Sequence, residues 1–206
     1  MTDPIILHEY APSGNCYKIR LTAALLGVPI ERRHYDIMTG ETRTPHFLAN
    51  VNANGRIPVL QVGSRFLPES NAACHWLAAG SALIPADRFD HADMLRWMFW
   101  EQYNHEPNVA TLRFWIAFIG EDALSEMQRG QLPGKRAAGE AALTLMATEL
   151  DQRDWLVGNA PSLADIALFA YTHVADEGDF DLARWPAIGR WIDRIKALPN
   201  YVSLAD

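Results

Sequence analysis

The sequence has few cysteines, with only Cys16 and Cys74 among 206 residues. Two thiols cannot form the disulfide framework of a small secreted protein, and we expect both to remain reduced. The sequence also lacks a CxxC or HExxH spacing, and its seven histidines are scattered. We therefore expect no metal site.

Basic residues and long apolar runs are also scarce. Lys and Arg number 18 against 25 Asp and Glu, for a net charge of −7. This balance argues against nucleic-acid binding, which needs a basic surface. No apolar run approaches the roughly 18 residues of a membrane span, and the N-terminus lacks the pattern of a signal peptide. The sequence therefore predicts a cytoplasmic protein that contacts neither nucleic acid nor membrane.

Hydrophobic residues are plentiful, at 49% with seven Trp, and this content excludes a disordered chain. The first 82 residues show strand and helix signals in alternation. We expect strands at 5–10, 29–37, 56–62 and 65–67, and helices at 16–27, 45–48 and 71–79. This order predicts a βαβ unit followed by a ββα unit, which is an α/β domain of about four strands.

Strand signals disappear in the second part of the chain. Residues 81–89 are typical of a linker, and residues 88–206 are predicted to be all-helical. Ser162 three residues before Asp165 indicates a capping-box variant at the start of a helix over 166–174. Further helices are expected at 135–150 and 188–198. The long helix that follows His91 is expected to pack through Leu95, Met98, Phe99, Gln102 and Tyr103.

Four short motifs occur in an order and spacing typical of a known family. They are Tyr10-Ala-Pro-Ser-Gly-Asn15, Gly55-Arg-Ile-Pro-Val-Leu60, Pro68-Glu-Ser-Asn71 and Pro161-Ser-Leu-Ala-Asp165. With them, nearly the whole chain resembles the cytosolic glutathione transferases, and in particular the bacterial serine-type enzymes. One departure is Asn52-Ala53, where the family usually has Asn-Pro. The resemblance implies a thioredoxin-like glutathione-binding domain over 1–82, an all-helical substrate-pocket domain over 88–206, a homodimer, and glutathione as co-substrate.

The resemblance also assigns the groups that bind glutathione. It implies a cis peptide bond between Ile57 and Pro58 that presents the Ile57 backbone to the cysteinyl part of glutathione. Glu69 and Ser70 precede a helix, whose N-terminus favours the γ-glutamyl carboxylate. Arg43 is the basic candidate for the glycyl carboxylate. Simpler roles stay open: Pro58 as a strand-start proline, Ser70 as a helix cap and Arg43 as a solvated surface residue.

Three residues are candidates for activating the glutathione thiol, which at a pKa of roughly 8.5 is mostly protonated at pH 7. Ser13 lies where the serine-type relatives have their catalytic hydroxyl, although it also suits a helix N-cap. Asn15 is a second donor, and Ser13-x-Asn15-x-x-Lys18 is similar to the motif of bacterial relatives that reduce disulfides with glutathione. Cys16 in a first helical turn is the third candidate, as in a cysteine-type bacterial class.

The second substrate is assigned to the helical domain. Tyr103, His105 and Arg113 combine an apolar wall with polar groups and are candidates for an electrophile pocket. The predicted function is attack of the glutathione thiolate on a small electrophile, as in detoxification. Alternatives are glutathione-dependent reduction of a disulfide or peroxide, and a non-catalytic binding or regulatory protein of the same fold.

Overall fold

The computed structural model describes residues 3–206, and the chain divides into two compact units. The first unit contains the N-terminal residues up to Ser81 together with Leu198–Asp206, and the second contains Ala82–Ala197. The sequence analysis assigns residues up to 206 to the helical domain, whereas the structure groups the last nine residues, Leu198–Asp206, with the first unit. No helix in the described part of the chain is long and apolar enough to cross a membrane.

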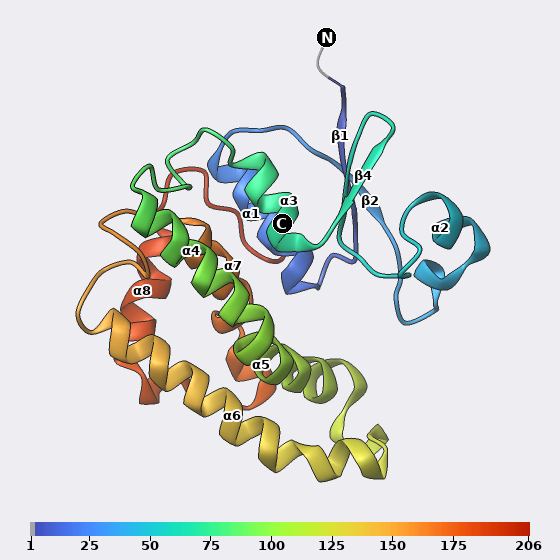
Figure 1. The fold of residues 1–206 in the computed structure, drawn as a ribbon. Coiled ribbons are helices and arrows are strands. Elements are labelled where there is room, and N and C mark those ends of the chain that lie inside the picture. Colours follow the sequence, from blue (N-terminus) through green and yellow to red (C-terminus); the bar gives the residue numbers. More distant parts are fainter. Residues whose placement is uncertain (1–2) are drawn as a thin grey trace. The chain divides into compact units, whose positions relative to one another are not determined.

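The first unit is built on a four-stranded mixed sheet in the order β2-β1-β3-β4. β1 pairs in parallel with β2 and antiparallel with β3, which pairs antiparallel with β4. The sheet lies between α1 and α3 on one side and α2 on the other (Figure 1). The elements are β1 (Ile5–Glu9), α1 (Gly14–Leu25), β2 (Glu31–His34), η1 (Glu41–Arg43), α2 (Pro45–Asn50), β3 (Val59–Val62), β4 (Arg65–Pro68) and α3 (Ser70–Leu77).

The core of the first unit lies where the central strands meet α1 and α3. Leu7 of β1 is paired with Leu60 of β3, and both are fully buried. Tyr17, Ile19 and Leu21 of α1 are also fully buried, and α1 packs against α3. This arrangement confirms the expected thioredoxin-like layout. Its consequence for function is that α1 and α3 both begin at the same end of the sheet, where β1 and β4 lead into them.

The second unit is helical, as predicted, and no strand is assigned in residues 88–206. Its elements are α4 (Arg88–Trp100), η2 (Glu101–His105), α5 (Glu106–Arg113), η3 (Phe114–Ile119), η4 (Glu121–Ala123), α6 (Glu126–Leu150), α7 (Leu163–Thr172), η5 (Ala175–Gly178), η6 (Leu182–Arg184) and α8 (Pro186–Lys196). The segments η2 and η3 are π-helical, so the chain from α4 through η3 is one long helix with two widened parts.

The apolar face expected for the long helix is only partly correct. Met98 is buried as expected, whereas Phe99 and Tyr103 are 71% and 84% exposed. The helix also buries Met94, Trp97, Glu101 and His105. These buried residues have the i, i+3, i+4 spacing of one helix face. The buried face of the helix differs from the expected one because it includes two polar residues, Glu101 and His105, which a search for apolar periodicity does not select.

The centre of the second unit is α7, whose residues are all buried. The predicted capping box is confirmed, because Ser162 accepts from the backbone of the first turn while Asp165 accepts from the Ser162 backbone. The Asp165 carboxylate also accepts hydrogen bonds from the Leu156 N–H at 3.0 Å and from Trp191 Nε1 at 2.9 Å. This one buried side chain therefore joins the start of α7 to the preceding loop and to α8.

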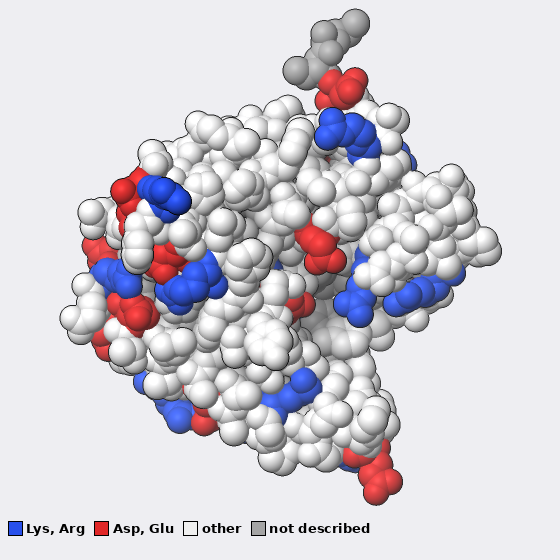
Figure 2. All heavy atoms as spheres, in the orientation of Figure 1, with Lys and Arg blue, Asp and Glu red and all other residues white. Residues whose placement is uncertain are grey.

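The charges on the surface are mixed. On the face in Figure 2, most of the surface is uncharged, and at the left of the view Lys and Arg side chains lie beside Asp and Glu side chains. Around α2, at the right of this view, the coloured atoms are mainly basic.

Candidate functional site

All three candidates for thiol activation lie at the start of α1, with Ser13 just before the helix and Asn15 and Cys16 in its first turn. Ser13 is the N-cap of α1, and its Oγ accepts a hydrogen bond from the Cys16 N–H at 3.4 Å. A serine hydroxyl accepts through its oxygen and donates through its own hydrogen. The capping role therefore leaves the Ser13 O–H group able to donate to a thiolate, and the two roles considered for Ser13 are compatible.

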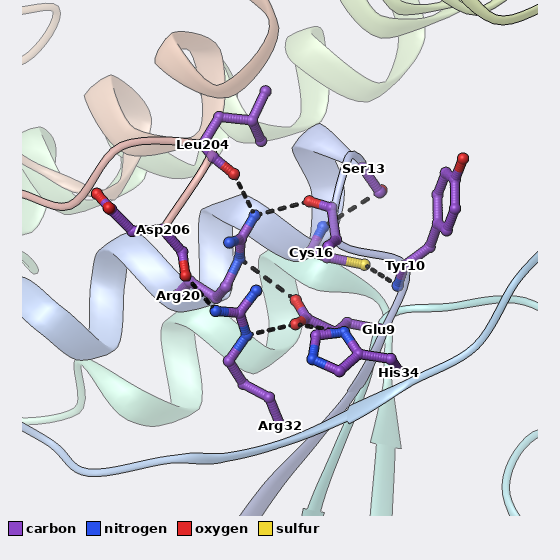
Figure 3. Close-up of polar contacts among 10 residues, drawn as sticks. Glu9, Tyr10, Ser13, Cys16, Arg20, Arg32, His34, Leu204 and Asp206 are labelled. Carbon is purple, nitrogen blue, oxygen red and sulfur yellow. Dashed lines mark hydrogen bonds and ion pairs between the residues drawn. The ribbon is translucent and has the colours of Figure 1, made fainter.

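Cys16 has the surroundings of a structural cysteine. Its side chain is fully buried, and its Sγ accepts from the Tyr10 N–H at 3.4 Å (Figure 3). Burial raises the pKa of the Cys16 thiol to about 12, against the lowering effect of the Tyr10 and Ser13 hydrogen bonds. A protonated, inaccessible thiol is a poor nucleophile and a poor partner for disulfide exchange. These surroundings favour Ser13 and Asn15 over Cys16.

The sequence analysis missed one residue beside this turn. Arg20 lies one helical turn after Cys16, is 5% exposed, and donates from Nη2 to the Ala11 carbonyl at 2.8 Å. The sequence signal that could have found Arg20 was its spacing from Cys16. A residue four positions after a buried helical residue lies on the same face of the helix. A charged residue at such a position requires partners inside the protein.

Asn15 and Ser70 connect the starts of α1 and α3. Ser70 is 5% exposed, and its Oγ donates to Asn15 Oδ1 at 3.2 Å. The hydrogen bond spans 55 residues of sequence and brings together one candidate for thiol activation and one candidate for carboxylate binding. A side-chain hydrogen bond therefore links the first turns of the two helices within the first unit.

Glu69 has a strained backbone at the start of α3. Its φ is 73° and its ψ is 113°, a conformation that residues with a side chain rarely adopt. Such strain costs on the order of 1–3 kcal/mol and is concentrated at functional sites. The conformation places Glu69 at the N-cap position without any side-chain capping hydrogen bond. The helix N-terminus that follows, with Ser70 as its first residue, favours an anion through its backbone N–H groups.

The remaining predicted glutathione contacts lie in η1 and in the loop between α2 and β3. The bond between Ile57 and Pro58 is cis, as expected. Arg43 donates from Nη1 to the Asn54 carbonyl at 3.1 Å. The same side chain lies under Gly55, where an added Cβ would come within 2.7 Å of Arg43 Nη1 and where φ is +62°. Arg43 therefore supports the loop before Ile57 through one N–H group of its guanidinium. Because a guanidinium has five N–H donors in all, this contact does not use up its capacity to donate.

The three residues predicted for the second substrate have different surroundings in the helical unit. Tyr103 is 84% exposed, whereas His105 is fully buried and lies 3.0 Å from Thr172 Oγ1 through Nε2. Arg113 is 5% exposed and forms an ion pair with Glu177 at 2.7 Å. Since His105 and Arg113 are held in the interior of the unit, the structure does not bring the three together on one open surface.

Comparison with known proteins shows the family of the chain. Residues 12–79 match the family model described as glutathione S-transferase, N-terminal domain, and residues 116–199 match glutathione S-transferase, C-terminal domain. A crystal structure of a glutathione S-transferase from Pseudomonas fluorescens is 43% identical, with a TM-score of 0.92, over 98% of this chain and 99% of that one. The chain belongs to the glutathione S-transferase family.

Curated members of the glutathione S-transferase family are more distant in sequence. Glutathione S-transferase-like protein LUC7 from Fusarium sp. is 29% identical over 90% of this chain and 85% of its own. Disulfide-bond oxidoreductase YfcG from Escherichia coli is 25% identical over 92% of this chain and 89% of its own. The matches extend over both units, so the family relationship covers the helical part as well as the sheet.

Proposed function

We propose that this protein is a glutathione transferase in which Ser13 stabilises the thiolate of bound glutathione for attack on a small electrophile. The hydrogen bond between Ser70 and Asn15 is the observation that carries the proposal. It sets the proposed anchor for the γ-glutamyl end beside the first turn of α1, where Ser13 caps the helix. In the reaction, the thiol proton leaves to solvent, sulfur forms a bond to the electrophilic carbon, and the leaving group departs with its electron pair.

The residues present fit glutathione, which has two carboxylates, an ammonium group and a thiol. In the proposal, Ser70 and the N-terminus of α3 bind the γ-glutamyl carboxylate, and Glu69 binds the α-ammonium. The Ile57 backbone pairs with the cysteinyl part, Pro58 fixes the direction of that backbone, and Arg43 faces the glycyl carboxylate. Ser13 and Asn15 act on the sulfur. The pocket for the second substrate is assigned to the helical unit, with Tyr103 as its exposed candidate.

A second candidate function is reduction of a disulfide by two molecules of glutathione, which yields two thiols and oxidised glutathione. The name of the Escherichia coli relative and the Ser13-x-Asn15-x-x-Lys18 spacing favour it. The deciding experiment compares conjugation to a chlorinated dinitrobenzene with reduction of hydroxyethyl disulfide by the same preparation. We expect conjugation to be the faster reaction. Faster disulfide reduction would move the protein to the second function, and no reaction with either substrate would contradict both.

The strained Glu69 provides a test of the glutathione anchor. Glu69→Ala and Glu69→Gly both remove the carboxylate, so both should weaken glutathione binding by about tenfold or more, as expected for one charge-assisted hydrogen bond. The two variants should differ in stability, because only glycine relieves the positive φ. Glu69→Gly should be more stable than Glu69→Ala by about 1 kcal/mol.

Isothermal titration calorimetry measures the first effect and urea denaturation the second. Wild-type affinity in both Glu69 variants would remove Glu69 from the proposed site. Equal stability of the two variants would mean that the strain is relieved by local rearrangement.

A homodimer is also part of the proposal. Phe89 and Phe99 of α4 are strongly exposed, at 79% and 71%. Exposed aromatic residues are typical of a contact surface between proteins. We expect light scattering coupled to size-exclusion chromatography to give twice the chain mass at micromolar concentration. A Phe99→Asp variant should shift the mass toward the monomer, and a monomeric wild type would contradict the proposal.

A further inference from the structure

The Ser13 turn is fixed by hydrogen bonds at three backbone groups. The Ser13 N–H donates to the Tyr10 carbonyl at 2.9 Å, and the Tyr10 N–H donates to Cys16 Sγ. The Ala11 carbonyl accepts from Arg20. The first two contacts are local in sequence, whereas Arg20 connects the turn to other parts of the unit.

Arg20 is held from two further directions. Its Nη2 also donates to the Leu204 carbonyl at 3.1 Å, and its Nε lies 3.3 Å from Glu9 Oε2 (Figure 3). Glu9 is fully buried and has a second cation, Arg32, whose Nε lies 2.5 Å from Oε1. His34 Nδ1 lies 3.4 Å from the same oxygen. Two guanidinium groups share one carboxylate, so each has donors that remain for backbone carbonyls.

Those donors reach the C-terminal segment, residues 201–206. Besides the Arg20 contact with Leu204, the Tyr17 hydroxyl donates to the Val202 carbonyl at 2.7 Å. Arg32 Nη1 lies 2.5 Å from the Asp206 backbone oxygen. All three contacts use backbone oxygens of the segment. Of these three side chains, Arg20 is the one that also donates to the Ser13 turn, at the Ala11 carbonyl.

We infer that Arg20 is a positioning residue for Ser13, and that its guanidinium links the Ser13 turn to the C-terminal segment. The inference rests on the proposed function of Ser13. The direction of a hydroxyl hydrogen bond depends on the backbone that carries it, and donors in a site must hold their geometry to within about 0.5 Å. Arg20 supplies this constraint at the Ala11 carbonyl, two residues before Ser13, from a side chain that is itself buried.

The Arg20→Lys variant tests this inference. Lysine keeps the positive charge beside Glu9, but a single ammonium cannot reproduce the planar fork that reaches Ala11, Leu204 and Glu9 together. We expect the pKa of the bound glutathione thiol, measured by thiolate absorbance, to rise by about one unit. At pH 7 kcat for conjugation should then fall about tenfold. KM for glutathione should change less than about twofold, since the proposed anchors are elsewhere.

Arg32→Lys is the matched control. Arg32 contacts Glu9 and the C-terminal segment but not the Ser13 turn, so this variant should keep the wild-type thiol pKa. A wild-type thiol pKa in folded Arg20→Lys, or equal increases in both variants, would overturn the inference. If Arg20→Lys does not fold, Tyr17→Phe replaces it, because this variant removes the hydrogen bond from the Tyr17 hydroxyl to the C-terminal segment. An unchanged thiol pKa in Tyr17→Phe would also overturn the inference. A wild-type protein that does not lower the thiol pKa would instead contradict the proposed function.

Discussion

Replacing Ser13 with alanine should raise the pKa of the bound glutathione thiol by about one to two units. The loss of the donated hydrogen bond destabilises the thiolate, and the rate of conjugation follows the thiolate fraction. At neutral pH, kcat/KM should therefore fall by about ten- to a hundredfold. Glutathione affinity should change little, because the proposed anchors lie at Ile57, Glu69 and Ser70. Stopped-flow titration of thiolate absorbance together with conjugation kinetics measures both quantities.

The pH profile of Ser13→Ala separates thiol activation from other defects. Because the variant raises the thiol pKa, its activity should be lost at neutral pH and recovered as the pH rises through the new pKa. A loss that stays constant across the profile would mean that Ser13 does not act on the thiol.

Matched variants distinguish the hydroxyl from the helix cap. Glycine at an N-cap costs only a few tenths of a kcal/mol, whereas alanine costs about 0.5–2 kcal/mol. Ser13→Gly should therefore lose as much activity as Ser13→Ala while remaining more stable, and Ser13→Thr should keep much of the activity. Normal rates in Ser13→Gly would move the assignment to Asn15. A mixed disulfide at Cys16 in oxidised wild-type protein would indicate the cysteine-type class instead.

Replacing Asp165 with alanine should reduce the free energy of unfolding by about 3–5 kcal/mol. The carboxylate is fully buried and accepts from the Leu156 N–H, the Ser162 N–H and hydroxyl, and Trp191 Nε1. The substitution leaves these donors without their acceptor in the interior, where each unsatisfied group costs about 1–3 kcal/mol. Urea denaturation followed by tryptophan fluorescence measures the loss.

Asp151→Ala is the control for Asp165→Ala. Asp151 also pairs with α8, through Arg190 at 3.1 Å, but both side chains are more than half exposed. An exposed ion pair contributes about 0–1 kcal/mol, so Asp151→Ala should remain close to the wild type. Similar losses in the two variants would contradict the role assigned to Asp165.

The sequence predicted those parts of the fold that depend on local signals. Apolar segments of strand length between turn residues predicted the central strands β1 and β3, and Ser162 with Asp165 predicted the start of α7. The buried face of the long helix was harder to predict from the sequence. Its π-helical segment Glu101–His105 widens a turn, and polar residues occupy its buried face, so apolar periodicity assigned the wrong residues to the core.

The start of α6 was missed for a different reason. The sequence predicts this helix from Lys135, where a segment rich in Ala, Leu and Glu begins. Pro133 and the neighbouring glycines, which are typical helix breakers, lie just before it. In the structure α6 begins at Glu126 and contains Pro133. Ser125 and Gln128 form a capping box at its start, which was the available signal.

The candidate site was predictable by resemblance in its individual residues but not in their connections. The motifs locate Ser13, Asn15, Glu69 and Ser70, yet no motif indicates that Ser70 donates to Asn15. Arg20 and the C-terminal segment were not predicted at all. Contacts with backbone oxygens require no particular side chain in the segment, and so they give no pattern in the sequence.

This use of backbone oxygens has a consequence for how the chain can vary. Val202 and Leu204 contribute carbonyl groups to Tyr17 and Arg20, so substitution of their side chains leaves those acceptors in place. Deletion of a single residue between them would bring the carbonyls out of register with their donors. Positions 202 and 204 should therefore tolerate wide changes of side chain during evolution or mutagenesis, while the number of residues between Tyr201 and Asp206 stays fixed.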